Sequence, residues 1–341
     1  MSALSRLGGA GPRNRTVLFA ALVGLPLSAF FFWLAFRNAD ADEVWSVLKD
    51  ADVGPVALAV AAMAGVYAGQ ALRWRAIART PTVSKVRFGE MVISGIAVNN
   101  VLPGRVGDLL RAHWLQVSAR IPGGRSLATV FVDRSFDVLA LVVFLAISLP
   151  YVAGADWLRR IAVGGLALLA AVVLVLVVAR VYTRRRNRGR RSHRSLLRRV
   201  VRDTLEGLAE PLGRMRTVVL ACGSLLTWAL WGLAAWLVAR AVGVELSVSE
   251  TIFVTAVVNL GVAIPSSPGF VGTYQWLGLS ALALFDIGTE QALAFAILMH
   301  AVWYVPTLLV GGSLLLVRGV RTVRRPGARR IALDRREAQD A

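Results

Sequence analysis

The sequence predicts an all-α integral membrane protein with about six full transmembrane helices and two re-entrant helical hairpins in an inverted-topology repeat. Three observations support this fold: the apolar composition, a motif that occurs twice, and clustered basic residues. Of 341 residues, 56% are apolar and 17% are charged, and the mean hydropathy is +0.62. Such a composition is too apolar for a soluble chain of this length.

Six apolar stretches are long enough to cross the hydrocarbon core, which requires roughly 20 helical residues. They lie at 17–36, 54–72, 128–152, 158–181, 217–242 and 291–317. The first stretch follows three arginines, as a signal peptide would, but it runs for 20 residues and no small-x-small cleavage site follows it. We therefore expect it to be an uncleaved first span.

Three other apolar segments, at 88–101, 251–264 and 273–285, are too short to cross. At ~1.5 Å per residue, such helices reach about 20 Å, whereas the hydrocarbon core is ~30 Å thick. These lengths predict half-helices that enter the membrane and return.

The short segments flank a repeated motif. Asn99 precedes the sequence P-G-R-V-G at 103–107, and Asn259 precedes P-G-F-V-G at 268–272, with a glutamate nine positions before each asparagine. Two helix-breaking motifs at matching places in two halves of a membrane protein indicate a transport site. The predicted hairpins are a first hairpin at 88–116 and a second hairpin at 250–286.

The chemistry of the two breaks favours an anionic ligand. Pro103 and Pro268 each lack the N–H group that would continue a helix. The glycines that follow allow close approach of a ligand. A half-helix that begins after such a break presents free N–H groups and a positive dipole end to an anion.

Charge sets the predicted topology. Ten arginines lie at 184–202 and eight at 318–336, whereas 37–53 carries five acids and two bases. Basic loops stay cytoplasmic. We therefore expect a cytoplasmic basic N-terminus (1–16), a transmembrane domain (17–317) with a cytoplasmic arginine-rich loop (182–216), and a basic cytoplasmic tail (318–341).

A count of crossings then places the two hairpins on opposite faces. If 88–115 were a full crossing, the ten-arginine loop would lie outside the cell. If this segment instead returns to the cytoplasm, every basic loop lies inside, and the second hairpin starts and ends at acidic external loops.

Polar and charged residues gather at the breaks and in the stretch 128–152. The predicted substrate-binding residues are Asn99, Asn100, Pro103, Gly104, Arg105, Gly107, Asp108, Arg111, Asp133, Arg134, Asp137, Asn259, Pro268, Gly269, Gly272 and Gln275. In one interpretation, three of these arginines bind a phosphate and the aspartates hold them in place. In the other interpretation, the charges lie near the cytoplasmic boundary and pair with one another.

Several function classes are disfavoured by pattern. The arginines flank membrane spans and no nucleic-acid motif is present, so we expect no nucleic-acid partner. One cysteine and three scattered histidines give no zinc set, and we expect neither a metal nor another cofactor. No metalloprotease or nucleophile-elbow motif occurs, so we expect no enzyme activity.

Three ordered motifs resemble a known family. They are N-N-x-L-P-G-R-x-G-D-x-x-R at 99–111, D-R-x-x-D at 133–137 and I-P-S-S-P-G-F-V-G-T-Y-Q at 264–275. The chain resembles the flippase-like domain of lysylphosphatidylglycerol synthase over about 15–325, as a stand-alone member. Many relatives have glutamate where this chain has Gln275. We also expect this protein to lack the aminoacyl-transferase domain of the bifunctional relatives. We therefore expect no lysyl transfer.

The resemblance implies a multi-pass protein of the bacterial inner (plasma) membrane with both termini cytoplasmic. It would move or bind an anionic phospholipid or a polyprenyl-phosphate-linked lipid between leaflets. Two alternatives remain: a non-catalytic membrane scaffold for a partner lipid-modifying enzyme or glycosyltransferase, or a channel.

Overall fold

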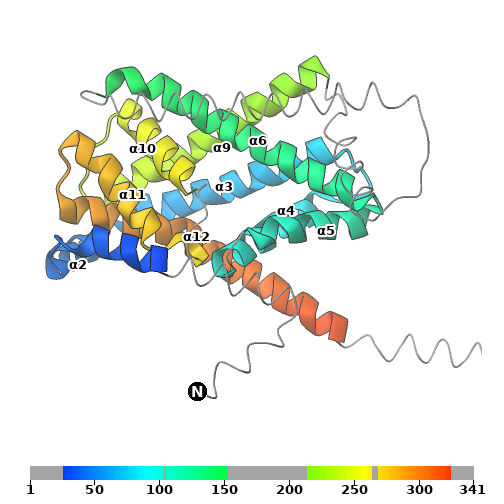
Figure 1. Cartoon of the computed structure of the whole chain (residues 1–341), viewed down its shortest axis with the longest axis horizontal. Helices are drawn as coiled ribbons and strands as arrows, with labels where there is room; N and C mark the ends of the chain where they lie inside the picture. Colours follow the sequence, from blue (N-terminus) through cyan, green and yellow to red (C-terminus); the bar gives the residue numbers. More distant parts are fainter. Residues whose placement is uncertain (1–25, 103–104, 153–212, 263–267, 324–341) are drawn as a thin grey trace, which may run out of the picture.

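A computed structural model of the protein describes residues 26–102, 105–152, 213–262 and 268–323 (Figure 1). Every regular element in these ranges is helical, as the sequence predicts. The α-helices are Pro26–Phe36, α2 (Ala41–Lys49), α3 (Val53–Ala78), α4 (Lys85–Val101), α5 (Val106–Ala119), α6 (Gly123–Ser148), α9 (Arg214–Ala241), α10 (Val248–Gly261), α11 (Thr273–Leu282) and α12 (Thr289–Val323). The 3-10 turns are η2 (Leu149–Tyr151), η3 (Pro268–Phe270) and η4 (Ala283–Phe285).

Three described helices are long and apolar enough to cross a membrane, namely α3, α9 and α12. Helix α6 has 26 residues, which is a sufficient length, but it carries Arg125, Asp133, Arg134 and Asp137. The predicted span 158–181 and most of the loop 182–216 lie outside the described residues. The count of six spans therefore stays a prediction.

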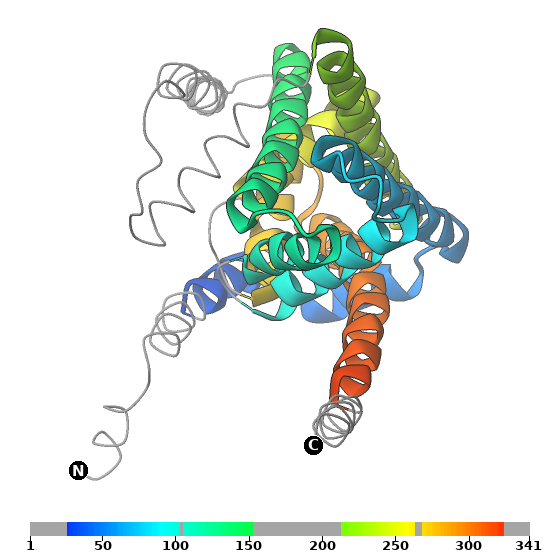
Figure 2. The same cartoon turned by 90° about the vertical axis from the view of Figure 1, so that its right-hand side faces the viewer.

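The longest helices enclose the main apolar core. Helices α3 and α9 lie side by side, and a side chain at Gly69 of α3 would meet the Thr227 hydroxyl of α9 at 2.7 Å. Buried tryptophans of α9, Trp228 and Trp231, pack in this core with residues of α6, α10 and α12. Helix α12 lies along α4 and extends out of the bundle at its carboxyl end (Figures 1 and 2).

The segments that connect the helices differ in charge between the two ends of the bundle. At one end, which we call the acidic end, the segments are 37–53, 149–152, 241–250 and 283–290; here the Asp52 N–H donates to the Ala241 carbonyl at 3.0 Å. At the other end, which we call the basic end, the segments are 73–87, 116–125 and 213–216; here Arg216 donates to the Ala76 carbonyl. Among the described residues, the acidic and the basic connecting segments thus lie at opposite ends of one bundle.

Two helical hairpins enter the bundle from these opposite ends (Figure 1). In the first hairpin, α4 starts at the basic end, where the Ser84 hydroxyl caps it, and α5 returns there. In the second hairpin, α10 starts at the acidic end and α11 returns there. A capping box starts α10: Ser247 Oγ accepts from the Glu250 N–H, and Glu250 accepts from the Ser247 N–H.

Candidate functional site

The breaks of the two hairpins lie against each other. A side chain at Gly269, in the break of the second hairpin, would lie 3.1 Å from the carbonyl oxygen of Asn100 in the first hairpin. On the other side, Arg105 Nη2 donates to the carbonyl oxygen of Val262, at the end of α10, at 3.4 Å. The two motifs that the sequence repeats are therefore brought together inside the bundle.

Helix α12 passes beside this contact and holds the end of α4. The side-chain amide of Asn100 donates to the Thr307 hydroxyl at 3.0 Å, and the Tyr304 hydroxyl donates to the Asn100 carbonyl at 3.4 Å. Asn100 is buried, with 2% of its surface exposed. Its predicted place beside the break is correct, and its described contacts are to protein groups.

Two glycines, Gly95 and Gly107, allow the two arms of the first hairpin to pack closely. Asn99 Oδ1 accepts from the Gly107 N–H at 2.7 Å, which satisfies a free donor in the first turn of α5. A methyl group at Gly107 would collide with the carbonyl oxygen of Gly95, and one at Gly95 would meet Arg111 Cγ at 2.6 Å. The backbones of α4 and α5 are therefore in direct contact at Gly95 and Gly107, and the Arg111 side chain packs against Gly95.

Between the arms, Arg105 adopts a left-handed backbone conformation, with φ of 55°, and its side chain is exposed. It comes directly before α5, whose first N–H groups are the anion-favouring end of a helix dipole. Pro103 and Gly104 lie outside the described residues.

The second break is held by side chains of α11 and α12. Gly269 and Gly272 have φ of 69° and 82°, which are left-handed conformations that favour glycine. Gln275 Oε1 accepts from the Gly272 N–H at 2.7 Å, and Gln275 Nε2 lies 2.9 Å from His300 Nδ1. Because the amide nitrogen only donates, Nδ1 of His300 accepts this hydrogen bond. Gln275 thus fixes both the break and the histidine ring.

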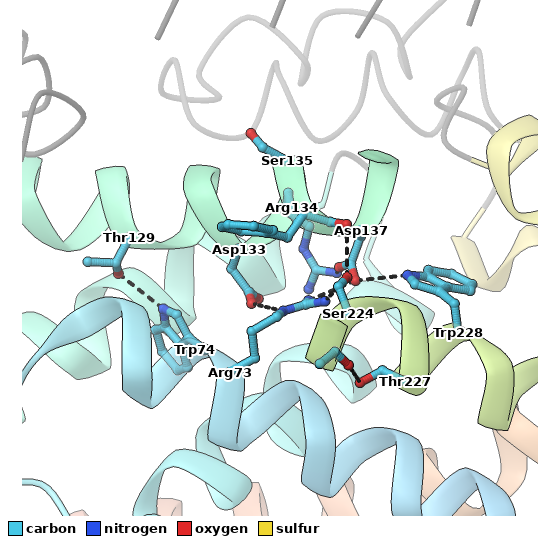
Figure 3. Close-up of polar contacts among 12 residues, drawn as sticks. Arg73, Trp74, Thr129, Asp133, Arg134, Ser135, Asp137, Ser224, Thr227 and Trp228 are labelled. Atoms are coloured by element: carbon cyan, nitrogen blue, oxygen red, sulfur yellow. Dashed lines mark hydrogen bonds and ion pairs between the residues drawn. The ribbon is translucent and has the colours of Figure 1, made fainter. Parts of the chain in front are cut away.

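Next to the first hairpin lies a buried network of ion pairs, centred on an arginine of α3 (Figure 3). Arg73 donates from Nε to Asp133 at 2.8 Å, from Nη2 to Asp137 at 2.7 Å, and from Nη1 to the Ser224 hydroxyl at 2.6 Å. The Trp228 indole also donates to Asp137, at 3.1 Å. The network therefore joins α3, α6 and α9.

Helix α5 joins the same network from the hairpin side. Arg111 donates to Asp133 at 3.1 Å and lies 3.5 Å from Asp108 Oδ1. Arg134 donates to Asp108 at 3.1 Å and to Asp137 at 3.1 Å. These contacts link the first hairpin to α6. We call the six residues the ion-pair network: Arg73, Asp108, Arg111, Asp133, Arg134 and Asp137.

The network is charge-balanced, with three arginines and three aspartates. Arg111 is completely buried, and its guanidinium carbon lies 4.3 Å from the centre of the Trp74 ring. The ring of Trp74 and the carboxylates of Asp108 and Asp133 thus offset part of the cost of burying the Arg111 charge. Of the three arginines predicted to bind phosphate, only Arg105 and Arg134 reach the surface of the described structure.

The structure thus places the predicted residues in two groups. The breaks hold Asn99, Asn100, Arg105, Gly107, Pro268, Gly269, Gly272 and Gln275, and the adjoining network holds Asp108, Arg111, Asp133, Arg134 and Asp137. Asn259 instead bonds within its own helix, since its amide donates to the Thr255 carbonyl at 2.8 Å. The contacts described for the predicted residues are with protein groups, so ligand binding by these residues stays a prediction.

One residue of the network, Arg73, was missed at the sequence level. The apolar stretch ends at residue 72, so the sequence indicated a cytoplasmic loop from 73 onward, whereas α3 continues to Ala78 and is 26 residues long. In a helix that continues past residue 72, Arg73 lies on the same face as Gln70, three positions earlier, and both side chains are buried. Two polar residues at this helical spacing at the end of an apolar stretch were the sequence feature that could have indicated Arg73.

The fold and the site define a helical membrane protein in which two broken-helix hairpins, entering from opposite ends, meet beside a buried ion-pair network. The chain belongs to the family of the lysylphosphatidylglycerol synthase transmembrane region, whose sequence model matches residues 18–311. The family resemblance noted from the three motifs is therefore confirmed.

Two archaeal proteins are similar to this chain. One is named glycosyltransferase AglD, from Haloferax volcanii, and is 28% identical over 338 residues, which cover 86% of this chain and 54% of that protein. This chain therefore spans about half the length of that relative. The other is UPF0104 membrane protein MJ1078, from Methanocaldococcus jannaschii, which is 22% identical over 225 residues, covering 64% of this chain and 93% of that protein.

Proposed function

We propose that the protein binds the anionic headgroup of a lipid where the two hairpins meet and moves that lipid between the leaflets of the plasma membrane. The observation that carries this proposal is the contact between the two breaks, through Arg105 and Val262 on one side and Asn100 and Gly269 on the other. Transporters built from inverted repeats hold their ligand between broken helices near the midplane.

The proposal includes a membrane orientation. The basic end faces the cytoplasm, both chain termini are cytoplasmic, and the hairpins are re-entrant from opposite faces. The support is that basic segments gather at one end of the bundle and acidic segments at the other, with one hairpin starting at each end. Each hairpin arm, from 10 to 17 residues long, is shorter than a full span.

The ligand class follows from the groups at the break. Arg105 is an exposed guanidinium, whose planar fork suits the oxygens of a phosphate group, and it directly precedes the positive end of α5. An anionic phospholipid and a polyprenyl-phosphate-linked lipid both carry this group. We propose no catalytic step and no cofactor, since the role given to these residues is binding.

The experiment is leaflet exchange in proteoliposomes. A phosphatidylglycerol with a fluorescent acyl chain is added to both leaflets, and a membrane-impermeant reductant bleaches the outer one. Exchange through the protein exposes the inner pool to the reductant, with phosphatidylcholine carrying the same fluorophore as the zwitterionic control. We expect Arg105→Ala to slow exchange, whereas Arg87→Ala, on the exposed start of the same hairpin, leaves it unchanged.

A second candidate is a membrane scaffold for a glycosyltransferase or another lipid-modifying enzyme. It is favoured by one specific observation: a relative named glycosyltransferase aligns with this chain over 54% of its own length, so that protein contains a further part. The exchange assay separates the two functions. Exchange no faster than in protein-free liposomes, across several anionic lipids and with a proton gradient supplied, would favour the scaffold.

A further inference from the structure

One ion pair of the network differs from the others in its exposure. Asp108 Oδ1 lies 3.1 Å from Arg134 Nη2 and 3.5 Å from Arg111 Nη1. The Asp108 side chain is 16% exposed and that of Arg134 is 28% exposed, whereas the pair of Arg73 with Asp133 is at most 3% exposed. Asp108 is therefore the anion at the accessible edge of the network, three positions after Arg105.

The two arginines that pair with Asp108, namely Arg111 and Arg134, also have more donors than its carboxylate satisfies. Three buried guanidinium nitrogens have no hydrogen-bond partner among the described residues: Nε and Nη1 of Arg111 and Nε of Arg134. Arg73, in the interior of the same network, has a partner for each of its three nitrogens. A single oxygen of Asp108 serves two guanidinium groups, so these arginines have donors left for an anion with more acceptor oxygens.

We propose that Asp108 occupies the position that the phosphate group of the lipid takes when it binds, so that the ligand displaces the Asp108 carboxylate from Arg134 and Arg111. This inference rests on the proposed function, because it assigns the ligand of that function to a particular pair of arginines. A phosphate diester carries one negative charge, so the exchange leaves the charge of the network balanced. The displaced carboxylate moves toward water.

A purely structural role for Asp108 makes the opposite prediction. An acid in the first turn of a helix is stabilising, and Asp108 lies in the first turn of α5. If that were its whole role, removing its charge would weaken the hairpin and would leave headgroup affinity unchanged or lower. If Asp108 competes with the ligand, removing its charge raises the affinity.

The test is binding of soluble dihexanoyl phosphatidylglycerol to the detergent-purified full chain, measured by calorimetry. We expect Asp108→Asn to bind about fivefold more tightly than the wild type, the effect of removing one partly buried ion pair. Asp108→Glu keeps the competing charge and is expected to bind no more tightly than the wild type. Glu90→Gln, which removes a partly exposed acid of the same hairpin outside the ion-pair network, is the matched control and is expected to change nothing.

Unchanged or weaker binding by Asp108→Asn overturns the inference, as does the absence of binding by both wild type and variant. If that variant yields no folded protein, Asp108→Ser removes the same charge with a smaller side chain and is judged by the same criterion. Inorganic phosphate is run in parallel, and phosphate alone binding as tightly as phosphatidylglycerol would overturn the assignment to a lipid. Tighter binding by the variant without leaflet exchange by the wild type would support this inference while contradicting transport.

Discussion

Arg73 Nε donates to Asp133 Oδ1 at 2.8 Å, and neither side chain is more than 3% exposed. This pair joins α3 to α6 at the depth of the first hairpin, and Asp133 also accepts from Arg111 of α5. A buried ion pair is costly to break, because the remaining partner keeps its charge without compensation. The position of the first hairpin therefore depends on an arginine that lies outside the hairpin.

Replacing Arg73 by leucine should destabilise the protein by about 3–5 kcal/mol, since two buried aspartates lose their main partner. Thermal unfolding of the detergent-purified variant, followed by tryptophan fluorescence, measures the loss. The control is Arg87→Leu, which breaks an exposed pair with Glu90 and should cost no more than about 1 kcal/mol. Equal effects of the two substitutions would show that the network contributes little to the fold.

Gly107→Ala should prevent the arms of the first hairpin from closing, because its methyl group meets the carbonyl oxygen of Gly95. We expect a large loss of folded protein, measured as the monodisperse fraction on size-exclusion chromatography. Gly89→Ala on α4 is the matched control. No atom lies within 4 Å of its added methyl group, and alanine favours the helix by roughly 1 kcal/mol. A normal yield of Gly107→Ala would mean that α4 and α5 are further apart than described.

The two motif asparagines should differ in their contribution to stability. Asn99→Ala removes the acceptor of the Gly107 N–H at the start of α5, a cap-like bond whose loss costs about 1 kcal/mol. Asn259→Ala removes only a bond to the Thr255 carbonyl of its own helix, and should be close to neutral. The comparison is of unfolding midpoints in the same detergent. A larger loss from Asn259→Ala would reverse the roles assigned here.

The sequence predicted the local features of the hairpins well. Short apolar runs indicated arms at 88–101, 251–264 and 273–285, and the structure has helices at Lys85–Val101, Val248–Gly261 and Thr273–Leu282. These features depend on residues close in sequence, such as the capping pair of Ser247 and Glu250.

The arrangement of the site depends on contacts between residues far apart in the chain, which local sequence patterns do not predict. Arg105 and Val262 are 157 positions apart, and no local pattern indicates that they meet. The repeat suggested equal roles for Asn99 and Asn259, but the hydrogen bond of each depends on the partner that packing provides. Likewise, Arg111 was placed correctly in the charged cluster, while its complete burial follows from its packing against Gly95 and Trp74.

The orientation of the hairpins underlies both the transport proposal and the role of Arg105. Single cysteines that label from one side of the membrane report this orientation directly. The exposed native Cys222 is first replaced by serine. Reporter positions are then exposed residues at the ends of the hairpin arms, two for each hairpin: Ser84 and Ser118, and Ser247 and Gly288.

The decisive measurement is labelling of these four variants in intact cells and in inverted vesicles with a membrane-impermeant maleimide. Our account predicts that cysteines at 84 and 118 are labelled only from the cytoplasmic side, and those at 247 and 288 only from outside. Labelling of 84 and 118 from opposite sides would mean that the first hairpin crosses the membrane, and it would contradict the inverted pair of re-entrant hairpins.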